Sequence, residues 1–266
     1  MAIYQVTDTR YLEKILEGCD HTLVWSCLQG YMGKAYADNL TAPKSVQIIV
    51  GDFCYFAGEV NEELIRNNLS RETSGFIIMT GENQDWNKKI QEVYGEKATK
   101  VTRYAIKKET GQFDLNKLHK IVQNMEKTYE IKLIDRACYE QIMTLPWACD
   151  FCSQFASYEE FENKGLGVVA LLDGKIVSGA SSYTVYQDGI EIQIDTEINY
   201  RRRGLALACA AKLIMECLSR GLYPNWDAQN KGSVALAEKL GYHFDYEYIC
   251  FEIRERSPYE KRSHQE

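Results

Sequence analysis

The stretch that decides the fold lies at residues 199–208 and reads Asn199-Tyr200-Arg201-Arg202-Arg203-Gly204-Leu205-Ala206-Leu207-Ala208. It joins a strand-like run to an apolar run with helical periodicity. The first turn of a helix leaves backbone N–H groups unpaired at the positive end of the helix dipole, and this makes an anion site. Glycine lets an anion approach the backbone closely, and three arginines add positive charge. The residues alone leave two interpretations open: an anion-binding turn, or a solvated basic turn with a glycine for geometry.

The segments around this turn predict mixed strands and helices. From residue 129 onward the order is strand, two helices, three strands, helix, strand, helix, strand. In the strand before the turn, alternate residues share one face, namely Ile190, Ile192, Ile194, Thr196 and Ile198. The first half mixes short helices and strands and ends in an amphipathic helix at 115–127, which Asp114 is placed to cap. The fold class is therefore α+β.

We place a domain boundary after that helix. The chain then consists of an N-terminal α+β domain at 1–127, a second domain at 128–256 and a polar tail at 257–266, with the polar stretch 107–112 as the best candidate linker. The two halves end in similar patterns, Asn83…Gly95…Tyr104 and Asn230…Gly241…Tyr248. This faint echo is a hint of an internal duplication, and the alternative is that the first domain is a lid that shapes the substrate site.

The pattern Arg201-x-x-Gly204-x-Ala206 resembles the (Q/R)xxGx(G/A) signature of the GNAT superfamily of N-acetyltransferases. The stretch from Asn230 to Tyr242 is similar to that family's second signature, with Asn-x-x-Ser at its start and Lys-x-Gly-aromatic at its end. The resemblance covers about residues 128–256 and implies a mixed, mostly antiparallel sheet flanked by helices, with the first domain as a degenerate copy of it or a lid. The two-part layout resembles the branch that includes the zwittermicin-resistance acetyltransferases, which implies a small amino-bearing substrate.

The resemblance also implies that acetyl-CoA is the cosubstrate. The pantetheine arm would bind where the family's fourth strand splays from the fifth, at Ile194, Asp195 and Thr196. The pyrophosphate would lie against Arg201, Arg202, Arg203, Gly204, Leu205, Ala206 and Leu207, and the next helix would contribute Asn230 and Ser233. The residues themselves equally fit a buried strand at Ile194 and Thr196, and a helix cap at Asn230 and Ser233.

Acetyl transfer to an amine needs a group that takes a proton from the amine, and a carboxylate can do so directly or through water. Glu191 lies near the position where family members place such a base, and Asp227 on the next strand is the second candidate. Glu191 equally fits an outward-facing strand residue. Many family members supply a tyrosine acid seven residues after the asparagine, but here that position is Ala237. This departure keeps a second hypothesis open, a non-catalytic module that binds acetyl-CoA as a sensor or partner subunit.

Composition excludes several other classes of protein. With 31 Lys and Arg against 38 Asp and Glu, the net charge is −7, which disfavours nucleic acid as a partner. No apolar run reaches the roughly 18 residues of a membrane helix, and the N-terminus lacks a secretory pattern. The nine cysteines are scattered, and the one CxxC, at Cys149 and Cys152, lacks the second pair that zinc would need. We expect a cytoplasmic enzyme without a metal, acting on a small-molecule amine, with a homodimer allowed.

Overall fold

The structure is a computed structural model that describes residues 2–69 and 75–254. It divides into two compact units, one formed by Met1–Arg103 with the residues from Glu247 onward, and the other by Tyr104–Tyr246. Two strands carry the chain across this division, β6 (Ala98–Ile106) and β13 (Phe244–Arg254). The tail expected at 257–266 lies outside the described residues.

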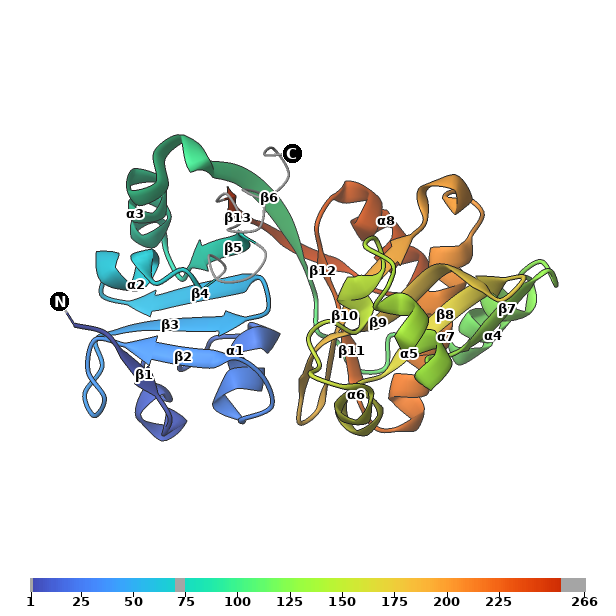
Figure 1. Ribbon diagram of the computed structural model, residues 1–266, viewed down its shortest axis with the longest axis horizontal. Coiled ribbons are helices and arrows are strands. Elements are labelled where there is room, and N and C mark those ends of the chain that lie inside the picture. Colours follow the sequence, from blue (N-terminus) through green and yellow to red (C-terminus); the bar gives the residue numbers. More distant parts are fainter. Residues whose placement is uncertain (1, 70–74, 255–266) are drawn as a thin grey trace, which may run out of the picture. The chain divides into compact units, whose positions relative to one another are not determined.

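The first unit is a twisted sheet with helices (Figure 1). Its strands are β1 (Tyr4–Val6), β2 (Lys34–Ala37), β3 (Ser45–Val50), β4 (Phe53–Gly58) and β5 (Phe76–Gly81), followed by β13 and β6 in the order β1-β2-β3-β4-β5-β13-β6. Its helices are α1 (Thr22–Leu28), α2 (Glu62–Arg66) and α3 (Gln84–Tyr94), with 3-10 turns at Thr9–Leu12 and Gly95–Lys97. The pair β4–β5 is parallel, and β5–β13 is antiparallel.

Strand β13 belongs to the hydrophobic core of the first unit. Ile253 is fully buried and Phe251 nearly so, and both belong to one cluster with Met79 of β5 and Trp86 of α3. Residues from the end of the chain therefore complete the core of its first hundred residues.

The second unit holds the sheet β11-β10-β9-β8-β7. Its strands are β7 (Tyr129–Leu133), β8 (Gly167–Leu172), β9 (Lys175–Tyr186), β10 (Gly189–Thr196), β11 (Tyr223–Asn225) and β12 (Asp227–Ala228). Its helices are α4 (Leu115–Gln123), α5 (Arg136–Ile142), α6 (Tyr158–Lys164), α7 (Leu205–Ser219) and α8 (Lys231–Leu240), with 3-10 turns at Cys149–Phe151 and Ile198–Tyr200. The pair β10–β11 is parallel, whereas β12 pairs with β6 in the antiparallel sense.

Helix α7 is the central helix of the second unit and packs against β8, β9, β10 and β11 (Figure 1). Its buried face is rich in small residues, including Ala208, Ala210 and Ala211, which let the helix lie close to the sheet. Helix α4, which the sequence placed in the first domain, packs on α7 and buries Leu118 completely. The units therefore divide between Arg103 and Tyr104 instead of at 127/128, because an amphipathic pattern shows that a helix has an apolar face but not which element covers it.

The two halves of the chain repeat one order of elements. The first half contains β4, α2, β5, α3 and β6, and the second half contains β10, α7, β11 with β12, α8 and β13. Each order begins with a parallel strand pair, and the helix after that pair is capped by an asparagine, Asn83 in α3 and Asn230 in α8. Each unit also adds a strand from the other half of the chain, β13 beside β5 and β6 beside β12. The echo in the sequence thus corresponds to a repeated topology.

Candidate functional site

Strand β10 has one edge that is only partly covered. It pairs with β9 along its length, but its pairing with β11 ends at Glu191 and Asn225. After Asn225 the chain passes through Trp226 into β12, which pairs with β6. Within the described residues, no strand pairs with β10 beyond Glu191 on this side. We call the stretch from Ile192 to Thr196 the open edge of β10.

The backbone of the open edge can bind an extended ligand. The N–H of Glu197 donates to Val177 O of β9 at 3.0 Å, so by alternation Thr196, Ile194 and Ile192 direct their backbone groups away from β9. Thr196 already uses both groups, because its N–H donates to Asp195 Oδ1 at 2.7 Å and its carbonyl accepts from Arg201 at 3.0 Å. The pair Glu191–Asn225 of the parallel ladder uses the N–H of Ile192. The C=O of Ile192 and both backbone groups of Ile194 therefore remain for a peptide-like chain to pair with.

A β-bulge marks the start of the open edge. The register of β9 and β10 shifts between Glu191 and Ile192, so that Glu191 faces Thr184 while Ile192 faces Ser182. Tyr183 is the extra residue on β9. A bulge bends the strand and re-aims the side chains beside it, and such bends are common next to active sites. Glu191 thus lies at the point where the sheet changes direction and its edge opens.

The basic turn leads directly from the open edge into α7. Gly204 is the N-cap of α7 with φ +82°, and it makes no side-chain cap, so the first N–H groups of the helix are not satisfied by a capping side chain. A Cβ built on Gly204 would meet only Met125 Sδ, at 3.9 Å. The space before the helix is therefore open, and the backbone conformation favours glycine. Arg202 also has a positive φ, of 65°, which is uncommon for a residue with a side chain.

The three arginines of the turn have different surroundings. Arg201 is held by Thr196 O at 3.0 Å and Asp195 Oδ1 at 3.2 Å. Arg203 donates to Tyr129 Oη and to Asn199 O, each at 3.2 Å, and its guanidinium lies 5.2 Å from the ring centre of Tyr200. Arg202 is exposed and makes no hydrogen bond or ion pair with the described part of the chain. Arg201 and Arg203 therefore stiffen the turn, and Arg202 has its charge available for an anion.

Glu191 is held by a residue that the sequence did not single out. Asn225, its register partner on β11, donates from Nδ2 to Glu191 Oε2 in a short hydrogen bond. Burial, with a contribution from the charge of Glu191, raises the pKa of Tyr186, Tyr223 and Tyr242 above the ordinary value for tyrosine. These hydroxyls stay protonated at neutral pH. The signal that could have revealed Asn225 is strand register, which sequence spacing does not give.

The remaining expected residues lie on β12 and α8. Asp227 is partly buried and follows Trp226. Asn230 caps α8 by accepting from Ser233 N–H at 3.0 Å, and Ser233 Oγ accepts from Trp226 Nε1 at 3.0 Å. The capping interpretation of Asn230 and Ser233 therefore describes their present contacts, and it is compatible with cofactor contact. Position 237 is a fully buried alanine, which has no hydroxyl group to donate a proton.

The corresponding elements of the first unit look different. There the parallel pair extends to Phe56 and Gly81, and Glu82 N–H continues it by donating to Phe56 O at 2.9 Å. Trp86 stacks on Phe56 with ring centres 5.0 Å apart, and its Nε1 donates to Gly58 O at 3.0 Å. The edge that is open in β10 is therefore closed in β4.

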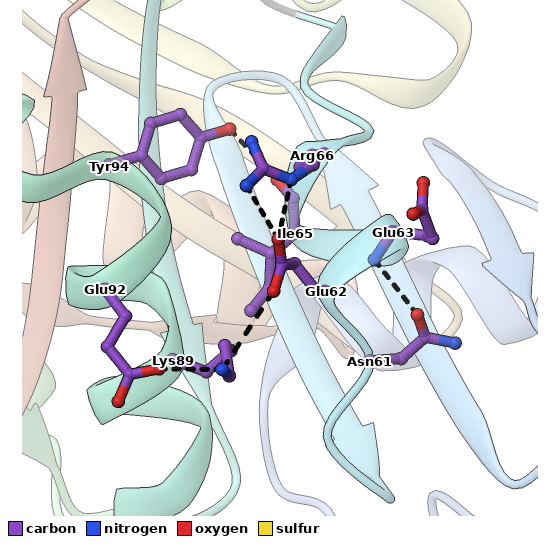
Figure 2. A network of polar contacts seen from close by, with 8 residues as sticks. All are labelled: Asn61, Glu62, Glu63, Ile65, Arg66, Lys89, Glu92 and Tyr94. Carbon is purple, nitrogen blue, oxygen red and sulfur yellow. Dashed lines mark hydrogen bonds and ion pairs between the residues drawn. The ribbon is translucent and has the colours of Figure 1, made fainter. Parts of the chain in front are cut away.

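The helix that follows β4 is also unlike α7. Figure 2 shows Asn61 capping α2 by accepting from Glu63 N–H at 3.0 Å. Glu62 in the first turn is bound by Arg66 at 2.6 Å and approached by Lys89 at 4.0 Å. The first turn of α2 thus carries two carboxylates of its own, which repel an anion where α7 would attract one.

The repeated order of elements, the open edge of β10 and the basic turn at a helix N-terminus are typical of acyltransferases. The profile of the GNAT acetyltransferase family matches residues 13–251, and the chain belongs to that family. The chain is 27% identical over 243 residues to the uncharacterized N-acetyltransferase YdfB of Bacillus subtilis, covering 86% of this chain and 89% of that protein. The match extends through both units, beyond the half of the chain that carries the sequence signatures.

Solved structures agree with this assignment. A GCN5-related N-acetyltransferase-like protein from Streptococcus suis is 41% identical, with a TM-score of 0.87 over 93% of this chain and 98% of that one. A tandem GNAT protein from the clavulanic acid biosynthesis pathway has the same fold at 7% identity, with a TM-score of 0.56 over 95% of this chain and 98% of that one.

These matches confirm the expected fold class, a mixed sheet flanked by helices, and show that the protein is an acyltransferase of a family that generally uses acetyl-CoA. Within residues 2–69 and 75–254, no helix is long and apolar enough to span a membrane. The same residues contain no group of His, Cys, Asp and Glu side chains that could hold a metal ion.

Proposed function

We propose that the protein transfers the acetyl group of acetyl-CoA to a primary amine of a small molecule, with Glu191 as the general base. The observation that carries the proposal is the position of Glu191 at the last β10–β11 pair, where the edge opens. An acyl donor that follows the open edge toward β11 would bring its thioester to this carboxylate. The zwittermicin-resistance branch, a cytoplasmic location and a homodimer remain predictions.

The residues of the second unit fit acetyl-CoA. Gly204 leaves open space before the uncapped N-terminus of α7, and this suits a pyrophosphate. Arg202 would contribute charge to the same anion, while Arg201 and Arg203 hold the turn in shape. The C=O of Ile192 and the backbone groups of Ile194 would pair with the amide groups of the pantetheine arm, as a neighbouring strand would. When bound, the cosubstrate supplies an activated thioester.

The chain's own part in the chemistry is to position the amine and remove its proton. An ammonium ion has no lone pair, so the amine must lose a proton before it attacks, and a carboxylate in contact with it can accept that proton. The Asn225 amide holds the Glu191 carboxylate in place. Asp227 is the second candidate base, and it equally fits a residue that attracts a cationic substrate.

The leaving thiolate receives no proton from position 237, because Ala237 is buried and has no acidic group. We propose that water protonates it. The pH profile of kcat/KM should then rise as the base ionises and show no alkaline fall that belongs to the enzyme, because no side-chain acid has to stay protonated. Such a fall would point to a side-chain acid.

We further propose that the first unit is a degenerate copy of the acetyltransferase fold that binds no acetyl-CoA. Its support is the repeated order of elements, together with the closed edge beside Trp86 and the carboxylates at the start of α2. The chain should therefore bind one acetyl-CoA.

Calorimetry and a thiol-release assay test the proposal. Acetyl-CoA should bind with a stoichiometry of one per chain, and thiol release should follow addition of at least one amine from a panel of spermidine, glucosamine, L-lysine and 2-phenylethylamine. Glu191→Gln should lower kcat by about 10²- to 10⁴-fold without changing the Kd of acetyl-CoA. Asp227→Asn is the matched variant and should mainly raise KM for a cationic amine.

Three outcomes would change the proposal. A larger loss of kcat in Asp227→Asn than in Glu191→Gln would transfer the role of base to Asp227. Binding of acetyl-CoA without turnover on any amine would favour the alternative that Ala237 raises, a non-catalytic module that binds the cofactor. Failure of acetyl-CoA to bind would overturn both.

A further inference from the structure

Asn225 has a buried amide whose orientation is fixed by chemistry. Its side chain is on the last residue of β11, and only 5% of the residue's surface is exposed. An ionised carboxylate can only accept hydrogen bonds, so the group that faces Glu191 Oε2 must be the NH₂ group of the amide. The carbonyl oxygen of Asn225 is therefore the other amide atom, which makes no hydrogen bond to Glu191.

That carbonyl oxygen, Asn225 Oδ1, is buried and accepts no hydrogen bond from the described residues. A buried polar atom without a donor destabilises the fold, and most such atoms in native proteins are satisfied. This one lies where pairing of β10 with β11 ends and the open edge begins. A donor supplied by a ligand would satisfy it, and the ligand that must come to this point is the acyl acceptor.

We propose that Asn225 selects a nitrogen acceptor over an oxygen acceptor, by accepting one N–H of the substrate at Oδ1 while its Nδ2 positions Glu191. This inference rests on the proposed function. A primary ammonium has three N–H groups and can donate one to Glu191 and another to Asn225. When Glu191 takes its proton, the N–H to Asn225 remains and holds the nitrogen while its lone pair attacks.

An alcohol cannot make both contacts. It has a single O–H, and if that proton goes to Glu191, Asn225 Oδ1 stays buried and unsatisfied. A site built to accept a particular hydrogen bond rejects analogues that lack the donor, because its own polar group is then left unpaired. The expected substrate class is a primary or secondary amine, and hydroxyl compounds of the same shape should be rejected.

The proton transfer balances without a further reactant. One N–H bond of the ammonium breaks, its electron pair stays on nitrogen and becomes the nucleophile, and the proton passes to the Glu191 carboxylate. The C–N bond then forms, the C–S bond breaks, and the nitrogen loses a second proton to water while the leaving thiolate takes a proton from water, so that the net reaction releases one proton. Asn225 exchanges no proton and acts only through hydrogen bonds. It is therefore a positioning and selectivity residue.

The test uses the full chain and three variants. Asn225→Leu removes both hydrogen bonds at similar volume, and Asn225→Asp keeps the acceptor but loses the donor. Asn61→Ala is the matched control, because it removes an equally buried asparagine that caps α2 of the first unit. Thermal melting establishes that each variant is folded, and Asn225→Asp keeps the test available if Asn225→Leu does not fold.

Two readouts separate selectivity from mere stability. The first is kcat and KM for the active amine of the panel and for its hydroxyl analogue, for example 2-phenylethylamine and 2-phenylethanol. The second is the pKa of Glu191, followed by NMR of protein labelled with ¹³C at the glutamate carboxyls and assigned with Glu191→Gln. This second measurement needs neither cofactor nor turnover.

We expect Asn225→Leu to lower kcat/KM for the amine by about 10- to 100-fold and to leave the Kd of acetyl-CoA unchanged. The loss for the alcohol should be smaller, because the alcohol loses only the positioning of Glu191 and not a hydrogen bond of its own. The pKa of Glu191 should rise in Asn225→Leu, because the charged form loses a donor, and also in Asn225→Asp, because a second carboxylate lies beside it. Asn61→Ala should change neither quantity.

Equal losses for amine and alcohol in Asn225→Leu, or an unchanged pKa of Glu191, would overturn the inference while the proposed function stands. An unmodified enzyme that turns over no amine would instead refute the proposed function, and with it this inference. The two failures are therefore distinguishable, since one is seen only in the variants and the other already in the unmodified protein.

Discussion

Ile253 in β13 offers a direct test of how the first unit is built. This isoleucine is fully buried in the cluster that contains Met79 and Trp86, although it lies about 170 residues further along the chain. The perturbation is Ile253→Ala. The matched control is Ile198→Ala, because Ile198 is 71% exposed in the 3-10 turn after β10.

The expected cost of Ile253→Ala follows from burial. Truncation of a buried isoleucine to alanine removes about three carbon groups at roughly 0.8 kcal/mol each and leaves a cavity, so the loss is about 2–5 kcal/mol. For a chain of this size, about 3 kcal/mol corresponds to a fall in Tm of roughly 6–12 °C. The exposed Ile198 has no such contacts, and Ile198→Ala should change stability by less than about 0.5 kcal/mol.

Differential scanning calorimetry of both variants measures these shifts. A Tm of Ile253→Ala within about 2 °C of that of Ile198→Ala would show that β13 is not part of the core of the first unit, and would refute the arrangement in which the end of the chain completes its beginning. The reasoning stands if only Ile253→Ala lowers the first unfolding transition.

Three further predictions concern the cofactor turn, a charged cap and the cysteines. Gly204→Ala and Gly174→Ala both place an alanine at a positive φ in open space, so each should cost about 1–2 kcal/mol in melting experiments, but only Gly204→Ala should raise the Kd of acetyl-CoA in calorimetry. Lys132 and the N–H of Cys138 hold the pKa of Asp135 at about 2, so its stabilisation is present above pH 4 and is lost as the pH falls through 2. Asp135→Asn should therefore lower the Tm slightly at pH 7 and not at pH 2; a difference that grows with acid would contradict this. Iodoacetamide should label at most Cys19 and Cys149 in the native protein, because the other seven cysteines are buried, and mass spectrometry would reveal any third label.

Local signals in the sequence identified much of the fold. Asp114 caps α4 by accepting from Lys117 N–H at 3.1 Å, and Asn230 caps α8, each where the pattern of polar and apolar residues indicated a helix start. The strand before the basic turn and the helix after it were also expected, because glycine and arginine at 201–204 interrupt two clear periodicities. These features depend on residues a few positions apart, and such spacing is visible in a sequence.

Features that depend on register were not predicted. The alternation of β10 led us to expect Ile198 on the face shared by Ile190 and Thr196, but the strand ends at Thr196 and Ile198 is exposed. The bulge at Tyr183 and the pairing of Glu191 with Asn225 depend on neighbouring strands, so the partner of the candidate base stayed hidden. The role of Glu191 as general base and the role of the basic turn in binding acetyl-CoA both remain predictions.

The location of β13 also has a consequence for synthesis of the protein on the ribosome. Strands β1 to β6 are made first, but their sheet lacks β13 until the end of the chain has been translated. About 150 residues separate β6 from the end of β13, which corresponds to roughly 7–30 s at 5–20 residues per second. During this interval the edge of β5 that pairs with β13 exposes backbone N–H and C=O groups, and Met79 lacks its apolar neighbours Phe251 and Ile253. A chaperone could bind this surface of the nascent chain during that period. The unit whose synthesis begins first is therefore completed last, because it needs β13.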